Sequence, residues 1–125
     1  MASGLIRSAN YQAVERAPLV GQYHDMRIAQ VPPPSSGGIV MLEALNILEG
    51  FRFDPRQPAA YILLWKPCGR AYRDRAEYLG DADFVKVPLA RLLSKQYAES
   101  LRTTISIDHA TLSAELQPTG AQLKY

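Results

Sequence analysis

The chain has 125 residues, enough for one domain with a buried core, and its 14 basic and 12 acidic residues leave a formal net charge of +2. Basic and acidic residues are interleaved, so no nucleic-acid surface is expected. No apolar run is long enough to span a bilayer. The N-terminus lacks the features of a signal peptide, so the chain as given is expected to be cytoplasmic. The single cysteine, Cys68, excludes an internal disulfide and a cysteine-based zinc site.

Two runs of strand-forming residues near the N-terminus predict a β-hairpin. They span Leu19 to Tyr23 and Met26 to Val31, with His24-Asp25 between them. A tight hairpin turn prefers Asn-Gly or Asp-Gly, and this pair is neither. The strands are therefore better specified by the sequence than the turn that joins them.

A proline arm and an apolar helix follow the predicted hairpin. Pro32-Pro33-Pro34 favours an extended backbone, Ser36 is a suitable helix cap, and Gly37-Gly38 allows close backbone approach. The run from Ile39 to Glu49 is apolar on nearly every side, which predicts a helix covered by neighbouring elements. Gly50 is expected to end this helix in the left-handed conformation.

Two further helices are predicted downstream. The first begins at Ala59, continues through Leu79 and ends with Gly80 just beyond its last turn. The second has Pro88 as its first residue and runs as one amphipathic helix to Leu101. Beyond it, the sequence suggests a short helical piece capped by Asp108 and a turn at 118–120.

Five blocks of the sequence follow, in order, the pattern of one family. They are Tyr11 to Pro18, Pro32 to Gly38, Leu45 to Gly50, Ala71 to Asp81, and Asp83 to Pro88. With these blocks the chain resembles the γ-glutamyltranspeptidases, also called glutathione hydrolases. The resemblance covers nearly the whole chain, and it corresponds to the C-terminal part of the family's large subunit, just before the point of self-cleavage.

The resemblance implies an α+β piece, mainly helical with a β-hairpin, of the four-layer αββα fold of N-terminal nucleophile hydrolases. Residues 1–125 would then be part of a larger domain. In the family, a threonine released by self-cleavage attacks the γ-glutamyl amide with its own amine as base, and in family order it would follow Tyr125. No catalytic residue, metal or cofactor is thus expected within this chain.

The same resemblance implies the partners and the location of the intact parent protein. The partner of this segment would be the small-subunit portion of the same precursor, and only the intact parent would bind glutathione. Family members are periplasmic or extracellular. The chain alone is expected to be inactive.

One segment departs from the family pattern. Trp65-Lys66-Pro67-Cys68-Gly69 stands where the family continues one helix with text such as Val-Glu-Ala-Met-Arg. A proline and a glycine inside a helix cost about 3 and about 1 kcal/mol relative to alanine. The codons GTG-GAA-GCC-ATG-CGG, read one base late, encode Trp-Lys-Pro-Cys-Gly. We therefore hypothesise a local shift of reading frame, corrected at Arg70; resequencing that finds no missing base would exclude it.

The turn formed by Ser35, Ser36, Gly37 and Gly38 is a weak candidate for substrate binding. Its hydroxyl and amide groups are of the kind that bind an anion. No acid or base is close to the turn in sequence, however. Helix capping with close backbone packing is therefore the favoured interpretation of these residues.

Other reactive residue types are interpreted as structural. Thr103-Thr104 is not the nucleophile, because it stands at the end of a predicted helix and Ile105 follows instead of histidine. The acidic residues Glu77, Asp81 and Asp83 lack EF-hand spacing, which favours a solvated or arginine-paired turn. Three further side chains have no partner in sequence and are expected to play no catalytic role: His24, His109 and Cys68.

The favoured hypothesis is an inactive segment of a γ-glutamyltranspeptidase. Two alternatives remain open from the sequence. One is a non-catalytic subunit or interaction module that needs a separately encoded small subunit for activity. The other is a small independent binding protein, which would show a cooperative thermal transition on its own.

Overall fold

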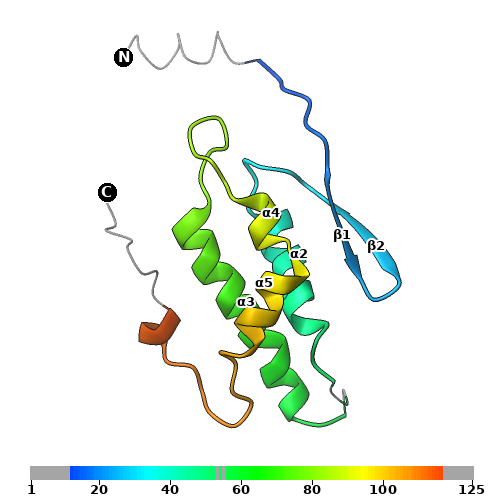
Figure 1. Ribbon diagram of the computed structural model, residues 1–125, viewed down its shortest axis with the longest axis vertical. Helices are drawn as coiled ribbons and strands as arrows, with labels where there is room; N and C mark the ends of the chain where they lie inside the picture. The colour runs from blue at the N-terminus through cyan, green and yellow to red at the C-terminus, as the bar shows by residue number, and fades with distance from the viewer. Residues whose placement is uncertain (1–11, 53, 55, 117–125) are drawn as a thin grey trace.

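The computed structural model describes residues 12–52, 54 and 56–116, and within them the fold is α+β, as predicted (Figure 1). A two-stranded hairpin packs beside a group of helices. The elements, in chain order, are β1 (Leu19–Tyr23), β2 (Met26–Gln30), α2 (Gly37–Leu48), α3 (Ala59–Tyr78), α4 (Leu89–Leu92), α5 (Lys95–Arg102) and the 3-10 helix η1 (Ser113–Leu116).

The predicted hairpin is confirmed. β1 and β2 are antiparallel, Leu19 pairs with Gln30 and Tyr23 pairs with Met26, so β2 ends one residue before the predicted Val31. The turn is closed by His24, whose φ of 50° lies in the left-handed region that non-glycine residues seldom adopt. The hairpin packs on α2 at Gly21. The contact is so close that a Cβ on Gly21 would collide with the Leu42 side chain.

Helix α2 is buried along one face and open along another. Its buried positions include Ile39, Leu42 and Ile47, whereas Met41 is 49% exposed. The prediction of a helix covered by neighbouring elements is therefore confirmed for one face. The described part of the chain leaves the face that includes Met41 uncovered.

Helix α3 packs along α2 (Figure 1). It passes without a break through residues 65–69, the aberrant segment that departs from the family pattern. Pro67 lies inside it with its side chain fully buried. The helix ends at Tyr78, and Leu79 leaves it with an extended backbone while its N–H still bonds to the Arg75 carbonyl at 3.2 Å. Gly80 does not adopt the left-handed conformation expected of a residue just beyond a helix.

The single helix predicted from Pro88 to Leu101 is wrong. The structure has two helices, α4 and α5, with Pro88 preceding α4 as its cap residue. The break arises at Ser94, which adopts an extended backbone (φ −79°, ψ 141°) and accepts a hydrogen bond on its hydroxyl from the Tyr97 N–H at 3.1 Å. A serine cap competes successfully with helix continuation, although the apolar spacing continues across it.

The predicted glycine end of α2 is also wrong. Gly50 does not adopt a left-handed backbone; it lies against the Arg102 side chain, where a Cβ would collide. Arg102 Nη1 donates hydrogen bonds to the carbonyls of Asn46 at 2.9 Å and Ile47 at 3.4 Å. A guanidinium from α5 thus satisfies the last carbonyls of α2, the groups that a glycine cap would otherwise serve.

The core lies where α2 meets α5. It contains Ile47, Ala98, Leu101 and Ile105, with Phe51 and Tyr97 packed against them. Asp108 does not cap η1, which begins five residues later, and the turn predicted at 118–120 is outside the described residues. In the described part of the chain, no helix combines the length and the apolar character that crossing a bilayer requires.

Candidate functional site

The proline-serine-glycine stretch brings the hairpin to the start of α2. Pro33 is buried and the Pro33-Pro34 peptide is cis. Ser36 occupies the cap position, but its hydroxyl makes no capping bond, so that part of the prediction is wrong. The Ser36 hydroxyl instead accepts a hydrogen bond from Arg75 Nε at 2.8 Å, which links the start of α2 to α3.

The two glycines of this stretch have different environments. A Cβ on Gly38 would collide with the Val31 carbonyl oxygen and would lie 2.9 Å from the Gln30 Cβ, so the predicted close backbone approach is confirmed there. Gly37 is exposed, and a Cβ on it would meet only the Ser35 hydroxyl at 3.8 Å. Close packing therefore requires glycine at position 38 but not at position 37.

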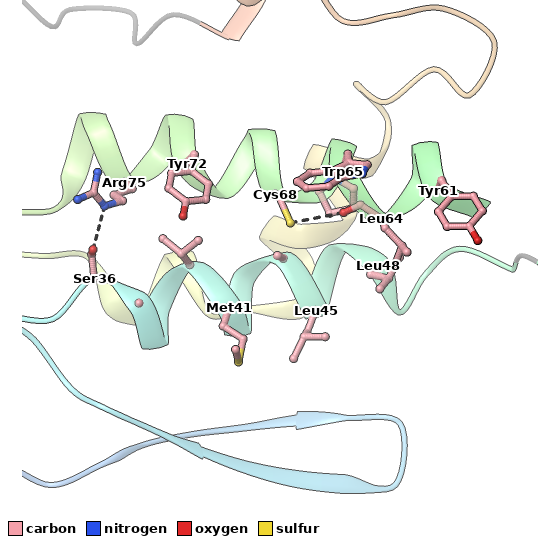
Figure 2. A pocket seen from close by; sticks show the side chains of 14 residues that line it. Ser36, Met41, Leu45, Leu48, Tyr61, Leu64, Trp65, Cys68, Tyr72 and Arg75 are labelled. Carbon is pink, nitrogen blue, oxygen red and sulfur yellow. Dashed lines mark hydrogen bonds between the residues drawn. The ribbon is translucent and has the colours of Figure 1, made fainter. Parts of the chain in front are cut away.

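A groove of about 630 Å³ runs between α2 and α3 (Figure 2). Its polar end holds Ser36 and Arg75, and the opposite end holds Tyr61. The remaining lining is almost wholly apolar and includes Met41, Leu45, Leu64, Trp65 and Tyr72. Trp65 is 75% exposed and Tyr61 is 66% exposed, which is unusual for large apolar side chains that lie together.

The chemistry available in this groove is limited. Arg75 is its one charged lining residue within the described chain, and a guanidinium cannot act as a general base. The Cys68 thiol donates to the Leu64 carbonyl at 3.4 Å within α3. The groove can therefore pack against an apolar surface, but its residues do not assemble an activated nucleophile.

The two threonines lie at the end of α5, as predicted. The Thr103 hydroxyl donates to the Ser100 carbonyl and the Thr104 hydroxyl donates to the Leu101 carbonyl, both at 2.7 Å. Thr104 also accepts a hydrogen bond from Arg70 Nε at 2.9 Å. Both hydroxyl groups are thus occupied by the helix end, and within the described residues neither has a base positioned to activate it.

The acidic turn includes the expected arginine pair. Asp83 accepts two hydrogen bonds from Arg16 Nη2, at 2.8 and 3.0 Å, and the Asp83 N–H donates to Asp81 Oδ1 at 3.0 Å. Glu77 lies separately on α3. Across the described ranges, no group of three or more histidine, cysteine or carboxylate residues is arranged to hold a metal ion.

The two histidines have no catalytic partner nearby in sequence, but in the structure both are exposed and each has a polar neighbour. The His24 N–H donates to Glu49 Oε1 at 2.6 Å, and its ring nitrogen Nδ1 lies 4.0 Å from the same oxygen. His109 Nδ1 lies 3.4 Å from the Ser106 hydroxyl, which also accepts from the Asp108 N–H at 3.2 Å. The second contact belongs to a turn in one exposed loop, so it is a local structural feature.

The sequence analysis missed a buried polar cluster in the core. Glu43 of α2, Asp74 of α3 and Tyr97 of α5 meet there, and the exposed fractions of Glu43 and Asp74 are 1% and 0%. Burial, and then the adjacent Asp74, raises the pKa of Glu43 to about 9. The sequence feature that could have revealed this cluster is Glu43 itself, a single acidic residue within a mostly apolar helix.

Comparison with known proteins identifies the fold first. A crystal structure of Helicobacter pylori gamma-glutamyltranspeptidase superposes with a TM-score of 0.82 at 36% identity, covering 92% of this chain and 34% of that chain. The described α+β elements are therefore part of the N-terminal nucleophile hydrolase fold. The sequence profile of the gamma-glutamyltranspeptidase family matches residues 8–124. The chain belongs to the gamma-glutamyltranspeptidase family.

Two curated relatives indicate how much of a family member is present. The glutathione hydrolase proenzyme of Escherichia coli K12 is 44% identical over 113 residues, which are 88% of this chain and 20% of that protein. The acylase ACY 1 proenzyme of Pseudomonas sp. SE83 is 40% identical over 105 residues, which are 82% of this chain and 19% of that protein. The chain thus spans about a fifth of the length of these relatives.

Proposed function

We propose that this chain is a structural segment of an enzyme that transfers or hydrolyses the γ-glutamyl group of glutathione. The main support for this proposal is that both the sequence and the fold match one family along most of the chain, including 44% identity to a glutathione hydrolase proenzyme. The acylase relative at 40% identity supports the broader reaction class, because an acylase removes an acyl group and the γ-glutamyl group of glutathione is itself an acyl group. The segment supplies structure, and another part of the protein supplies the nucleophile.

The proposed reaction requires an N-terminal threonine, which we assign to the remainder of the precursor. The hydroxyl of an N-terminal threonine attacks the γ-glutamyl carbonyl, the free amine of the same threonine takes up the hydroxyl proton, and the amine product leaves with a proton. Water or an amino acid then accepts the acyl group. Thr103 and Thr104 do not fit this role, because each hydroxyl bonds to a carbonyl at the end of α5.

We assign the apolar groove between α2 and α3 to packing against the remainder of the precursor. An exposed surface that includes Met41, Tyr61 and Trp65 is unfavourable in water, and burial of apolar area stabilises by about 25 cal/mol per Å². The relatives contain about five times as much chain as is present here, which would supply the covering surface. On this proposal, only the assembled protein binds glutathione.

The binding role of Ser35, Ser36, Gly37 and Gly38 stays a prediction. The Ser36–Arg75 bond favours a structural role for that serine, whereas the exposed Ser35 and Gly37 leave part of the turn accessible. We place the intact protein in the periplasm or outside the cell, on the basis of its family. Cell fractionation that recovered the full-length protein only from the cytoplasm would contradict this location.

A chimera tests the proposed function. The 113-residue matching segment of the E. coli glutathione hydrolase proenzyme is replaced by the corresponding residues of this chain. The expected result is self-cleavage into two subunits on a denaturing gel and release of glutamate from glutathione. A second chimera with Thr103→Ala and Thr104→Ala is the control, and it should retain both activities.

Four outcomes distinguish the alternatives. Glutamate release by residues 1–125 alone, or a folded chimera that neither cleaves itself nor releases glutamate, would contradict the proposal. Activity restored by mixing residues 1–125 with a separately expressed small subunit would favour the interaction module. A sharp cooperative thermal transition of residues 1–125, together with an inactive chimera, would favour an independent binding protein.

A further inference from the structure

Three helices bring ionisable side chains together inside the protein. Helix α2 packs against both α3 and α5 (Figure 1), and Glu43, Asp74 and Tyr97 meet where these helices come together. Glu43 and Asp74 are buried to 1% and 0% exposure. Two buried carboxyl groups side by side are costly when both are charged, so their protonation must be coupled to the packing of the helices.

The hydrogen bonds of the two carboxyl groups are unequal. Asp74 accepts from the Tyr97 hydroxyl at 2.6 Å and from Arg73 Nε at 3.1 Å. Neither oxygen of Glu43 has a donor within the described residues. The negative charge is therefore better placed on Asp74, and Glu43 needs a proton of its own.

Protonation allows the buried Glu43 side chain to form a hydrogen bond that its ionised form lacks. The protonated carboxyl group has one O–H, which can donate to the neighbouring Asp74 carboxylate. Burial is the main cause that raises the pKa of Glu43, and the Asp74 hydrogen bond and charge act in the same direction, while Arg73 opposes them. At neutral pH this leaves a carboxylic acid bonded to a carboxylate across the contact between α2 and α3.

We propose that Glu43 and Asp74 form a proton-dependent clamp that holds α2 against α3 and α5 and loosens as the pH rises. The proposal does not depend on the enzymatic function proposed above. When Glu43 loses its proton, the O–H···O bond is lost and two negative charges face each other in the core. The contact between the helices then becomes repulsive.

The surrounding elements do not offer Glu43 an alternative partner in the described structure. From α3, Arg73 acts on Glu43 but bonds to Asp74; from α5, Tyr97 also bonds to Asp74. From α4, Arg91 lies over the Tyr97 ring, 4.6 Å from its centroid, and faces Tyr78 as well. The hairpin packs on α2 through Gly21, which carries no titratable group.

The direction of the pH effect follows from the proton count. Glu43 has an ordinary pKa of 4.5 in the unfolded chain and a pKa of about 9 in the folded chain. Between these values the folded chain holds the extra proton, so stability is greatest below the lower value and is lost as the pH rises towards the upper one. One such proton changes the unfolding equilibrium constant by up to about tenfold per pH unit.

Urea unfolding of residues 1–125 from pH 5 to pH 9 tests the clamp. The urea midpoint should fall as the pH rises. Glu43→Gln should flatten this dependence and raise the midpoint at pH 8, because an amide keeps a donor for Asp74 without ionising. The matched control is Glu99→Gln on the exposed side of α5, which should retain the wild-type pH dependence.

Carbon NMR supplies an independent readout that needs no cooperative unfolding. The side-chain carboxyl signal of Glu43, assigned by its loss in Glu43→Gln, should titrate several pH units above the ordinary glutamate pKa of 4.5. A Glu43 signal that titrates near its ordinary value would overturn the clamp. So would an urea midpoint whose pH dependence is the same in Glu43→Gln and wild type.

Discussion

Arg75 donates a hydrogen bond from Nε to the Ser36 hydroxyl at 2.8 Å, and this bond ties the last turns of α3 to the first turn of α2 (Figure 2). It explains why a serine at the cap position of α2 does not cap that helix. The backbone of Ser36 is helical (φ −83°, ψ −17°), whereas a capping residue typically has an extended backbone. The hydroxyl therefore serves contact between helices rather than the helix end.

Ser36→Ala should destabilise the chain by about 1 kcal/mol, because it leaves the Arg75 guanidinium without this acceptor. Urea unfolding at pH 6 measures the change. Ser35→Ala is the matched control on the adjacent exposed serine, and it should change stability by less than about 0.5 kcal/mol. Equal effects of the two substitutions would contradict the assigned role of the bond.

Adjacent glycines at the start of α2 provide a second matched pair. Gly38→Ala should destabilise by about 1 to 3 kcal/mol, because its methyl group would collide with the fixed Val31 carbonyl and crowd Gln30. Gly37→Ala should stabilise by about 0.5 to 1 kcal/mol, because the site is open and alanine is the better helix former. Urea midpoints of the two variants should move in opposite directions, and a shared direction would show that the hairpin does not constrain this turn.

The cap of α5 gives a third prediction. Ser94→Ala should lower the stability of the chain by about 1 kcal/mol, because the Tyr97 N–H in the first turn of α5 loses its capping acceptor. Ser100→Ala lies within α5 on its exposed side and should have a small effect. Unfolding curves and far-ultraviolet circular dichroism measure both. An unchanged Ser94→Ala variant would mean that packing alone sets the helix break.

Local patterns predicted most of the secondary structure, and contacts between distant residues account for the errors. The alternation in β1 and β2 and the apolar run of α2 specify their elements directly. The end of α2 depends on Arg102, which is about fifty residues away, and no local glycine rule could reveal it. The break at Ser94 was present in the sequence as a serine cap, but the apolar spacing across it concealed the signal.

Part of the candidate site could also be predicted from the sequence. The resemblance to the family identified the turn at Ser36 and Gly38, and the close backbone approach at Gly38 follows from the absence of a side chain in glycine. The Arg75 contact and the Glu43–Asp74 cluster join different helices, so they required the fold. The apolar groove between α2 and α3 could not be predicted from the sequence. An apolar sequence indicates that a helix face is buried, but it does not indicate whether this chain or the rest of a larger protein covers that face.

Replacement of the aberrant segment within α3 is the fourth prediction. Pro67 has no N–H for the Leu63 carbonyl, four residues earlier in the helix, so Pro67→Ala should stabilise by up to about 3 kcal/mol. Gly69→Ala should add up to about 1 kcal/mol, reduced by its contact with Leu116, whose Cδ1 would lie 3.3 Å from the new methyl group. Urea unfolding and helical circular dichroism measure both changes.

Pro58→Ala supplies the control for this prediction, because Pro58 precedes α3 at its cap position and interrupts no helical bond. Losing that proline should leave stability unchanged or lower it by about 0.4 to 1 kcal/mol through greater freedom of the unfolded chain. Replacing Pro67 and Gly69 together by alanine should combine the gains at these two positions and leaves the hydrogen bonds of Lys66 in place. If this replacement lowers stability, or if resequencing finds no missing base near the codons of residues 65–69, the shifted-frame hypothesis is wrong and the buried proline is a native feature of α3.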